Sequence, residues 1–265
     1  MDQFTSLINS YLPEPHASLL NGIVLGIDLQ TTYSFKDKLK DVGLIHIVVL
    51  SGMNITLLSA VILQIIIPLF GRKAATIITI VSIIFFIYFV GIDPPIVRAG
   101  IMGILSLIGL MFGRKTLALY TLFLTSIICI IIWPDWLTSI SFQLSFAATF
   151  GIILFGNVVS EEKTTNTIKN YLIDELRVSL SAQLFTTPII FFYFRQISFI
   201  SPIANILVSW TIAPIMIYGI IAMVVGSIHW QLGFVVSWLC YGLVTFIILV
   251  VEWLSQIPFA SVKIL

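Results

Sequence analysis

Residues 43–58, GLIHIVVLSGMNITLL, decide the fold class because they form the start of a long apolar run. A helix that crosses a bilayer needs about 20 predominantly apolar residues, and this stretch fits the first part of such a helix. Four residues interrupt the apolar run: His46, Ser51, Gly52 and Asn54. Polar side chains are costly against lipid, so we expect this side of the helix to face the inside of a helix bundle.

The composition of the whole chain indicates an integral membrane protein. Of its 265 residues, 59% are hydrophobic and only 9% are charged, and the mean hydropathy is +1.11. Soluble domains carry about 25% charged residues, so most of this surface is expected to face lipid. The net charge of +1 excludes a global basic field for nucleic acid, and any anion site must therefore come from local residues.

The hydropathy pattern predicts an all-α, polytopic membrane helix bundle with about eight transmembrane helices. The predicted spans are 43–69, 74–92, 98–112, 117–133, 137–157, 178–194, 201–228 and 232–254. Pro202 and Pro214 predict a kink or break in the seventh span. Residues 160–177 are interpreted as a hydrophilic loop. The short basic corners at 71–73 and 113–115 favour a cytoplasmic location for their side, which places both termini outside.

The chain is divided into an N-terminal segment, residues 1–42, with interfacial or re-entrant helices, and a transmembrane domain, residues 43–265. Phe35, Leu39 and Val42 recur at helical spacing with charged residues between them. This pattern predicts a helix that lies in the plane of the membrane interface. An ordinary helix that caps the bundle explains the same pattern equally well.

The polar residues of the first span share one broad side if residues 43–69 form one helix. His46 and Gln64 then point the same way, with Asn54 about 80° and Ser51 about 140° round the helix. A hydrogen bond to a neighbouring helix is the simpler explanation for Ser51 alone, whereas His46 and Asn54 together are harder to explain by packing. Ser51 and Gly52 also permit the close approach of another backbone, or a break in the helix.

Two other polar residues lie near the starts of later spans. Arg98 follows the stiff turn Asp93-Pro94-Pro95 by one helical turn. It could extend to the interface and pair with Asp93, or it could bind phosphate oxygens with its planar fork. Asn205 follows Pro202 near the start of its span, where irregular backbone is tolerated if protein or a water-filled cavity surrounds it.

The fifth span carries small residues at helical spacing, Ser141, Ser145 and Ala148, which predict a packing seam. Gln143 points to the opposite side and is left as an undecided polar contact. Cys129 and Cys240 both lie in apolar runs and are interpreted as packing residues.

The motifs of common enzymes are missing from the sequence. GLMFGRKT is one residue too short for a phosphate loop, and it ends an apolar span rather than a strand. The histidines at positions 16, 46 and 229 form no metal-binding motif, and a G-x-S-x-G elbow is absent. We therefore expect no enzymatic activity, no catalytic residue, no metal site and no cofactor.

Five blocks of the sequence, in this order, resemble the competence domain of the ComEC family of bacterial DNA-uptake proteins. Family members are similar to G-L-x-H-L-L-A-V-S-G-L-H-V in the opening stretch, so Gly43, Leu44, His46, Ser51 and Gly52 coincide. The other blocks are PEP...LL.G..LG before this stretch, VRAGIM at 97–102, SFQLSFAATFGI at 141–152 and SPIANIL at 201–207. The resemblance spans residues 13–255, but Asn54 stands where many relatives have a second histidine.

The resemblance implies a multi-pass channel that admits single-stranded transforming DNA through the bacterial cytoplasmic (inner) membrane. It implies that His46, Ser51, Gly52, Asn54, Gln143 and Asn205 line the passage and that Arg98 contacts phosphate. It also implies a surface DNA receptor and a cytoplasmic helicase-like motor as partners, beside the lipid bilayer. Because positive charge is sparse, a homo-oligomer could supply further arginines.

Family members commonly also carry an OB-like domain and a metallo-β-lactamase-like domain. We expect neither in this sequence, and a separate chain would then supply any nuclease. Three other interpretations stay open. One is a small-solute secondary transporter with broken spans. Another is a non-conducting membrane scaffold. The third is an intramembrane enzyme that uses His46 and Ser51, whose angular separation suits direct hydrogen bonding poorly.

Overall fold

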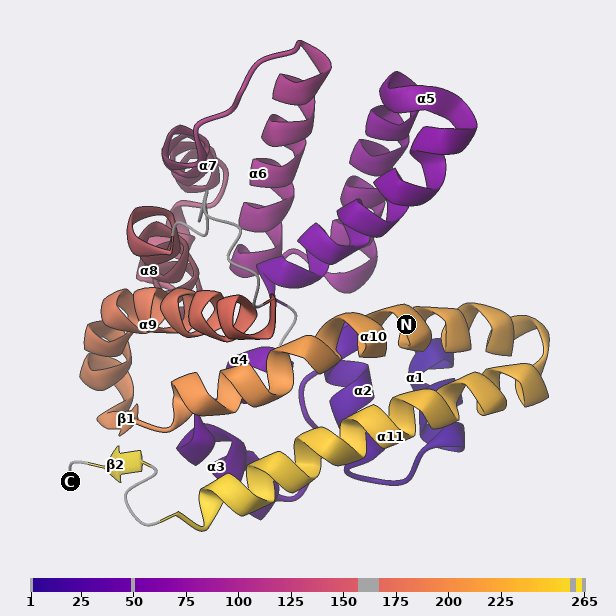
Figure 1. Ribbon diagram of the computed structural model, residues 1–265, viewed down its shortest axis with the longest axis vertical. Coiled ribbons are helices and arrows are strands. Elements are labelled where there is room, and N and C mark those ends of the chain that lie inside the picture. The colour runs from indigo at the N-terminus through magenta and orange to yellow at the C-terminus, as the bar shows by residue number, and fades with distance from the viewer. Residues whose placement is uncertain (1, 49–50, 157–166, 258–260, 264–265) are drawn as a thin grey trace. The chain divides into compact units, whose positions relative to one another are not determined.

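The computed structural model describes residues 2–48, 51–156, 167–257 and 261–263, and these are almost entirely helical (Figure 1). The helices are α1 (Asp2–Tyr11), α2 (His16–Leu25), α3 (Tyr33–Val42), α4 (Ile45–Val48), α5 (Gly52–Val90), α6 (Pro94–Met111), α7 (Ala118–Ile132), the 3₁₀ helix η1 (Pro134–Thr138), α8 (Ile140–Phe155), α9 (Thr167–Phe194), α10 (Ser201–Ile228) and α11 (Trp230–Ser255). Two short strands, β1 (Gln196–Ser198) and β2 (Ser261–Lys263), complete the described elements. The predicted helical fold is confirmed for these residues.

The elements form two compact units. Unit 1 combines both ends of the chain, Met1–Leu50 and Phe194–Leu265, and unit 2 is the segment between them, Ser51–Tyr193. Unit 1 therefore holds α1 to α4, the two strands, α10 and α11, whereas unit 2 holds α5 to α9.

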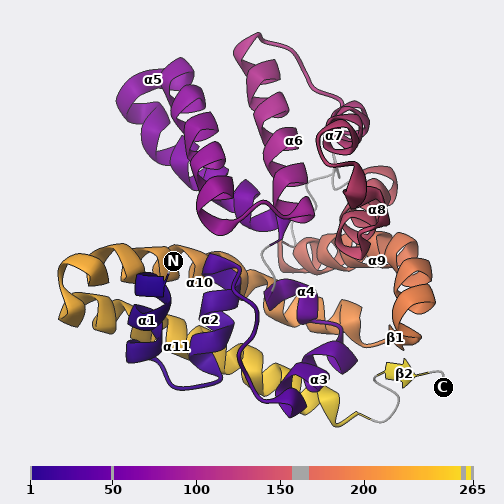
Figure 2. The same ribbon diagram turned by 180° about the vertical axis from the view of Figure 1, so that it is seen from behind.

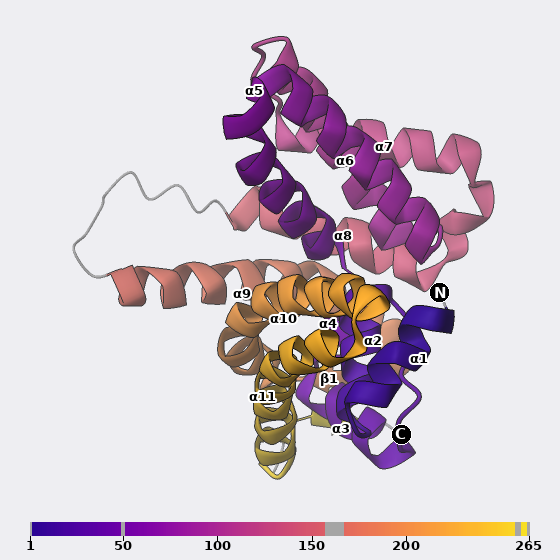
Figure 3. The ribbon, with the colours of Figure 1, turned by 90° about the vertical axis from the view of Figure 1, so that its right-hand side faces the viewer.

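Four of the described helices are long and apolar enough to cross a membrane: α5, α6, α10 and α11. Helix α5 has 39 residues, about twice the length that one crossing needs. Its backbone leaves the helical conformation at Gly71 (φ 78°, ψ 170°), a left-handed φ that favours glycine. Figure 3 shows the two limbs of α5 meeting at a sharp bend. Gly71 belongs to the basic corner expected from the sequence. The shorter apolar helices include α7 and α8, so the count of eight spans stays a prediction.

The core of unit 1 forms where α10 and α11 run side by side (Figure 1). Gly226 of α10 and Gly233 of α11 let the two backbones approach closely near the turn between the helices. Helix α2 packs against this pair, as seen from behind in Figure 2. Every residue of α2 from Ala17 to Leu25 is buried, and Gly219 of α10 leaves room for Val24.

Helix α3 forms where the spacing of apolar residues predicted it. Phe35, Leu39 and Val42 are buried, and the helix packs against α11. It ends at Gly43, whose φ of 77° is left-handed. The apolar face of α3 thus packs inside unit 1, and the location of this helix at the membrane interface stays a prediction.

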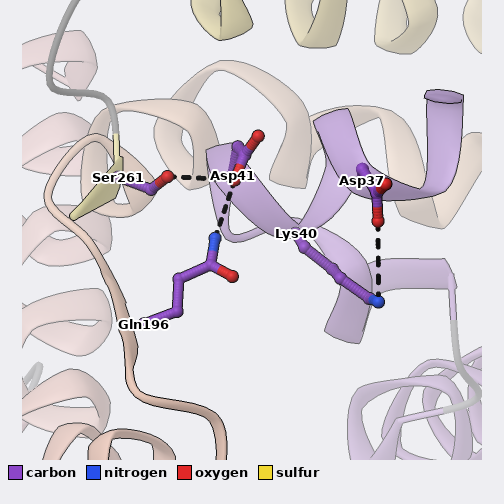
Figure 4. A network of polar contacts seen from close by, with 5 residues as sticks. All are labelled: Asp37, Lys40, Asp41, Gln196 and Ser261. Carbon is purple, nitrogen blue, oxygen red and sulfur yellow. Dashed lines mark hydrogen bonds and ion pairs between the residues drawn. The ribbon is translucent and has the colours of Figure 1, made fainter. Parts of the chain in front are cut away.

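A polar network joins α3 to the two strands (Figure 4). The strands pair in antiparallel register, with Ser198 opposite Ser261. The Asp41 carboxylate accepts hydrogen bonds from Nε2 of Gln196 (2.8 Å) and from Oγ of Ser261 (2.9 Å). The hydroxyl of Ser198 donates to the main-chain oxygen of Asp41 at 2.8 Å. The two strands, which are distant in sequence from α3 and from each other, are thus held at one residue of α3.

Unit 2 is organised around α6. Gly100 of α6 lies directly against Ile87 and Ile83 in the second limb of α5, so a side chain at this position would clash. On another side, Val97 of α6 forms a buried cluster with Cys129 of α7 and Phe142 of α8. Cys129 thus serves as a packing residue, as the sequence indicated.

The structure corrects parts of two expectations about the later segments. The predicted loop covers residues 160–177, of which 160–166 lie outside the described residues. Residues 167–177 are the start of α9, because strong helix formers such as Leu172, Glu175 and Arg177 continue the helix despite the charges in this stretch. Residues 201–228 form one continuous helix, α10, with Pro214 inside it, so the predicted break is absent from α10 and the predicted kink stays a prediction. Membrane helices tolerate an internal proline when neighbouring groups satisfy the freed backbone atoms.

Candidate functional site

The side chain of Arg98 lies inside unit 2, between α5 and α8. Asp93 is the N-cap residue of α6, and Pro94 and Pro95 occupy its first turn, where the absence of a proline N–H costs no hydrogen bond. Arg98 comes one turn later, and its Nε donates a hydrogen bond of 2.8 Å to Oγ of Ser145 on α8. Its Nη1 contacts Sδ of Met102, one turn further along α6, at 3.6 Å.

Gly52 leaves the space that the guanidinium group occupies. A Cβ atom added at Gly52 would lie 2.5 Å from Nη2 of Arg98 and 3.0 Å from Cβ of Ala99. Gly52 is the first residue of α5, so the guanidinium group lies against the start of this helix. Any larger residue at position 52 would push the Arg98 side chain away.

Arg98 carries a positive charge that no carboxylate neutralises among the residues described. The salt bridges found there join Lys38 to Glu252 and Lys40 to Asp37. The expected pair between Asp93 and Arg98 does not form, because Asp93 is exposed and the guanidinium group turns towards Ser145. Arginine stays protonated in proteins, so this half-buried charge is permanent.

The start of α5 adds to the positive potential around Arg98. The N-terminus of a helix carries a partial positive charge from its unpaired N–H groups. Ser51 is the N-cap residue, and its side chain makes no capping hydrogen bond. The guanidinium group and the helix terminus therefore have the same sign, so an anion that approached both would be attracted by each.

The opening stretch of the sequence is not one helix. Helix α4 ends at Val48, Ser51 is extended (φ −105°, ψ 166°), and α5 begins at Gly52. The angular argument that placed His46 and Asn54 on one side of a single helix is therefore wrong. Serine and glycine both favour helix termini, which explains the break at this point.

The structure places the predicted site residues in both units. His46 is exposed on α4, and Asn205 is half-buried on α10, both in unit 1. Asn54 of unit 2 is buried, with 2% of its surface exposed. Within unit 2 the structure brings Gly52 and Arg98 together, with Ser51 next to them in the chain.

Gln143 has a local partner. Its Nε2 donates a hydrogen bond of 2.9 Å to the main-chain oxygen of Leu137, which ties η1 to the start of α8. The polar contact that the sequence left undecided is therefore accounted for by this bond. Its assignment to the lining of a passage stays a prediction.

Sequence reasoning did not identify Ser145 as the partner of Arg98. It placed Ser145 in a small-residue packing seam, whereas the structure gives it the shortest polar contact of Arg98. The available signal was chemical: an arginine in an apolar span requires an acceptor, and serines in neighbouring spans are candidates.

The long apolar helices, with a charged side chain turned inward, define a helical membrane protein of the polytopic class. The family model of the competence protein matches residues 23–265, so the chain belongs to the competence protein family. This match confirms the resemblance to the ComEC family that the sequence blocks indicated.

Two curated relatives match the chain over most of its length. It is 26% identical over 239 residues to ComE operon protein 3 of Bacillus subtilis strain 168. This matched region covers 88% of this chain and 30% of the relative. It is also 28% identical over 186 residues to an uncharacterized protein of Aquifex aeolicus strain VF5. This second matched region covers 68% of this chain and 41% of that protein. The chain thus spans less than half the length of these relatives. No solved structure matches it.

Proposed function

We propose that this chain forms all or part of a passage that carries one DNA strand through the bacterial cytoplasmic membrane during natural competence. Arg98 is the observation that carries the proposal. Its guanidinium group is half-buried in an apolar bundle, is hydrogen-bonded to Ser145, and has no carboxylate partner among the described residues. A permanent charge in such a place is costly unless an anion offsets it.

The phosphate groups of a DNA strand suit this charge. A guanidinium group presents N–H donors that bind phosphate oxygens in pairs. A single strand carries one phosphate per nucleotide, and contacts with basic groups release its counterions. Each chain contributes one such arginine, so each contact with the strand is weak, and a conducting passage requires weak binding so that the strand can leave.

Membership of the competence protein family supports the connection with DNA uptake. We propose that eight spans cross the membrane, with the two limbs of α5 as the first pair.

The proposed activity is transport without covalent chemistry. A surface receptor that delivers DNA, a cytoplasmic motor that pulls the strand and a separate nuclease would be its partners, because the proposed passage only conducts the strand. An assembly of several copies would bring several Arg98 side chains together.

The test is uptake of labelled double-stranded DNA by cells with and without the gene, with surface-bound and nuclease-protected label measured separately. The proposal expects deletion to abolish protected label and to leave surface label unchanged. Arg98→Ala should lower protected label at least 10-fold. Arg98→Lys keeps the charge but loses the planar guanidinium group, so its protected label should lie between those of the wild type and Arg98→Ala. Arg114→Ala is the matched control, because Arg114 is exposed at a corner of unit 2.

Each variant must first be shown to reach the membrane in normal amount. Protected label that is unchanged on deletion would exclude DNA import and favour a small-solute transporter. Full uptake with Arg98→Met would instead favour a scaffold, which tolerates an apolar residue inside the bundle.

A further inference from the structure

The hydrogen bond between Arg98 and Ser145 has a consequence for how the proposed contact with DNA is made. Serine and threonine hydroxyls in membrane helices commonly donate to a carbonyl oxygen one turn earlier. In unit 2, Thr79, Thr125 and Thr149 do so, with distances of 2.7–2.9 Å. Ser145 makes no such bond among the described residues, and its Oγ instead accepts from Nε of Arg98 on another helix.

This bond uses Nε and leaves Nη1 and Nη2 of Arg98 without an oxygen acceptor among the described residues. The group binds an oxyanion in two parallel hydrogen bonds through either its Nε–Nη2 side or its Nη1–Nη2 end. Ser145 occupies Nε, so the Nε–Nη2 side is already in use. Met102 contacts Nη1 only through a thioether sulfur, a weak acceptor that a phosphate oxygen would readily replace.

Gly52 restricts the guanidinium group from a second helix, α5. The absence of a side chain there lets Nη2 lie against the start of α5, while Ser145 holds Nε from α8. The guanidinium plane is therefore held between two helices rather than free to rotate. A donor fork that is held in one orientation loses less conformational entropy when it binds its ligand.

We propose that Ser145 is a positioning residue for Arg98, which it orients so that the Nη1–Nη2 end meets a phosphodiester group of the passing strand. This inference rests on the proposed function of the chain. Ser145 acts through Arg98, so its effect on DNA uptake should exist only while Arg98 is present.

The test is a double-mutant cycle in the uptake assay, with nuclease-protected label as the measurement. Ser145→Ala should lower the rate of uptake about 3- to 10-fold, as expected for loss of one typical intramolecular hydrogen bond. Ser145→Thr, which keeps the hydroxyl, should restore uptake to at least half of the normal rate. In an Arg98→Lys background, which keeps partial uptake, Ser145→Ala should have little further effect because lysine has no Nε–H to hold.

Ser141→Ala is the matched control, because Ser141 lies one turn earlier on α8 and is exposed. It should leave uptake unchanged. The melting temperature of each purified variant separates loss of folding from loss of positioning.

Equal fold-losses from Ser145→Ala in the wild-type and Arg98→Lys backgrounds would show that Ser145 acts independently of the guanidinium group, and would overturn the inference. Normal uptake with Ser145→Ala would also overturn it, while a strong effect of Arg98→Ala would leave the proposed function standing. If neither Arg98→Ala nor Ser145→Ala changes uptake, the proposed function fails together with this inference.

Discussion

Gln196 donates a hydrogen bond of 2.8 Å to the carboxylate of Asp41, although the two residues lie 155 positions apart in the sequence (Figure 4). Ser261, from the C-terminal strand, donates to the same carboxylate oxygen. One side chain of α3 thus joins segments from both parts of unit 1. This arrangement identifies Asp41 as a residue whose removal should loosen β1 and β2 together.

Replacement of Asp41 by alanine should lower the stability of unit 1 by about 1–3 kcal/mol, because donors to a charged group lose their acceptor. The measurement is the melting temperature of the purified protein in detergent. Asp37→Ala is the control: Asp37 is on the same helix, but it makes an exposed pair with Lys40 at 3.7 Å, of a kind worth about 0–1 kcal/mol. Equal melting temperatures for the two variants would contradict the assigned role of Asp41.

Two glycines of α11 should respond in opposite directions to substitution by alanine. At Gly233 a Cβ would lie 2.5 Å from Cα of Gly226 and 2.9 Å from the main-chain oxygen of Ala222, so the helices must separate, at a cost of about 1–3 kcal/mol. A Cβ added at Gly242 would meet no neighbouring atom within 4 Å, so alanine there should stabilise the helix by about 0.5–1 kcal/mol. Melting temperatures measure both effects, and a loss at Gly242 as large as that at Gly233 would contradict the packing of α10 on α11.

The stability of unit 1 should fall as the pH is lowered, because of His16. Its ring stacks on Tyr241 with centroids 4.4 Å apart, and its Nε2 lies 2.9 Å from Oγ1 of Thr245. The Thr245 hydroxyl donates to the main-chain oxygen of Tyr241, so Nε2 must be the donor to Oγ1 and Nδ1 carries the free lone pair. Burial lowers the pKa of His16, against the opposing charge of Glu14.

The sign of this effect follows from proton binding. The unfolded chain takes up a proton at His16 near its ordinary pKa of about 6.5, whereas the folded protein does so only at lower pH. Below about pH 6.5 the unfolded state therefore binds more protons, and stability falls until the pH passes the folded pKa. Melting temperatures between pH 8 and pH 5 should fall less for His16→Gln than for the wild type. His229→Gln, at an exposed histidine, should keep the wild-type dependence.

The proposed eight-span topology predicts which corners face the cytoplasm. In a protein whose Cys129 and Cys240 are replaced by alanine, cysteines that replace Lys73 and Lys115 should react with an impermeant thiol reagent only from the cytoplasmic side. A cysteine in place of Asp135, which is exposed in η1, should react only from outside. Reaction of Lys115→Cys and Asp135→Cys from the same side would contradict the topology.

Sequence reasoning succeeded where a feature depends on local pattern and length. The run of apolar residues at 201–228 predicted both ends of α10. The basic corner at 71–73 predicted a turn where α5 bends. The spacing of Phe35, Leu39 and Val42 predicted the buried face of α3. Each of these features is set by residues within a few turns of one another, which is the range that periodicity covers.

Features that depend on tertiary contact were not accessible in the same way. The partner of Arg98 lies 47 residues away on α8, and hydropathy does not distinguish a serine that packs from one that accepts a hydrogen bond. The sequence allowed either close approach or a helix break at Ser51 and Gly52, and the structure has both. The charged residues of 167–177 suggested a loop because charge was weighed above helix propensity.

The division of unit 1 between the two ends of the chain affects how the protein is made. The buried helix α2 ends at Leu25, and its partner α10 begins at Ser201, which is 176 residues later (201 − 25). At about 5–20 residues per second, a ribosome needs roughly 10–35 s to synthesise that interval. Throughout this time the apolar surface of α2 lacks α10 and α11, so lipid or a protein of the insertion machinery must shelter the nascent helix.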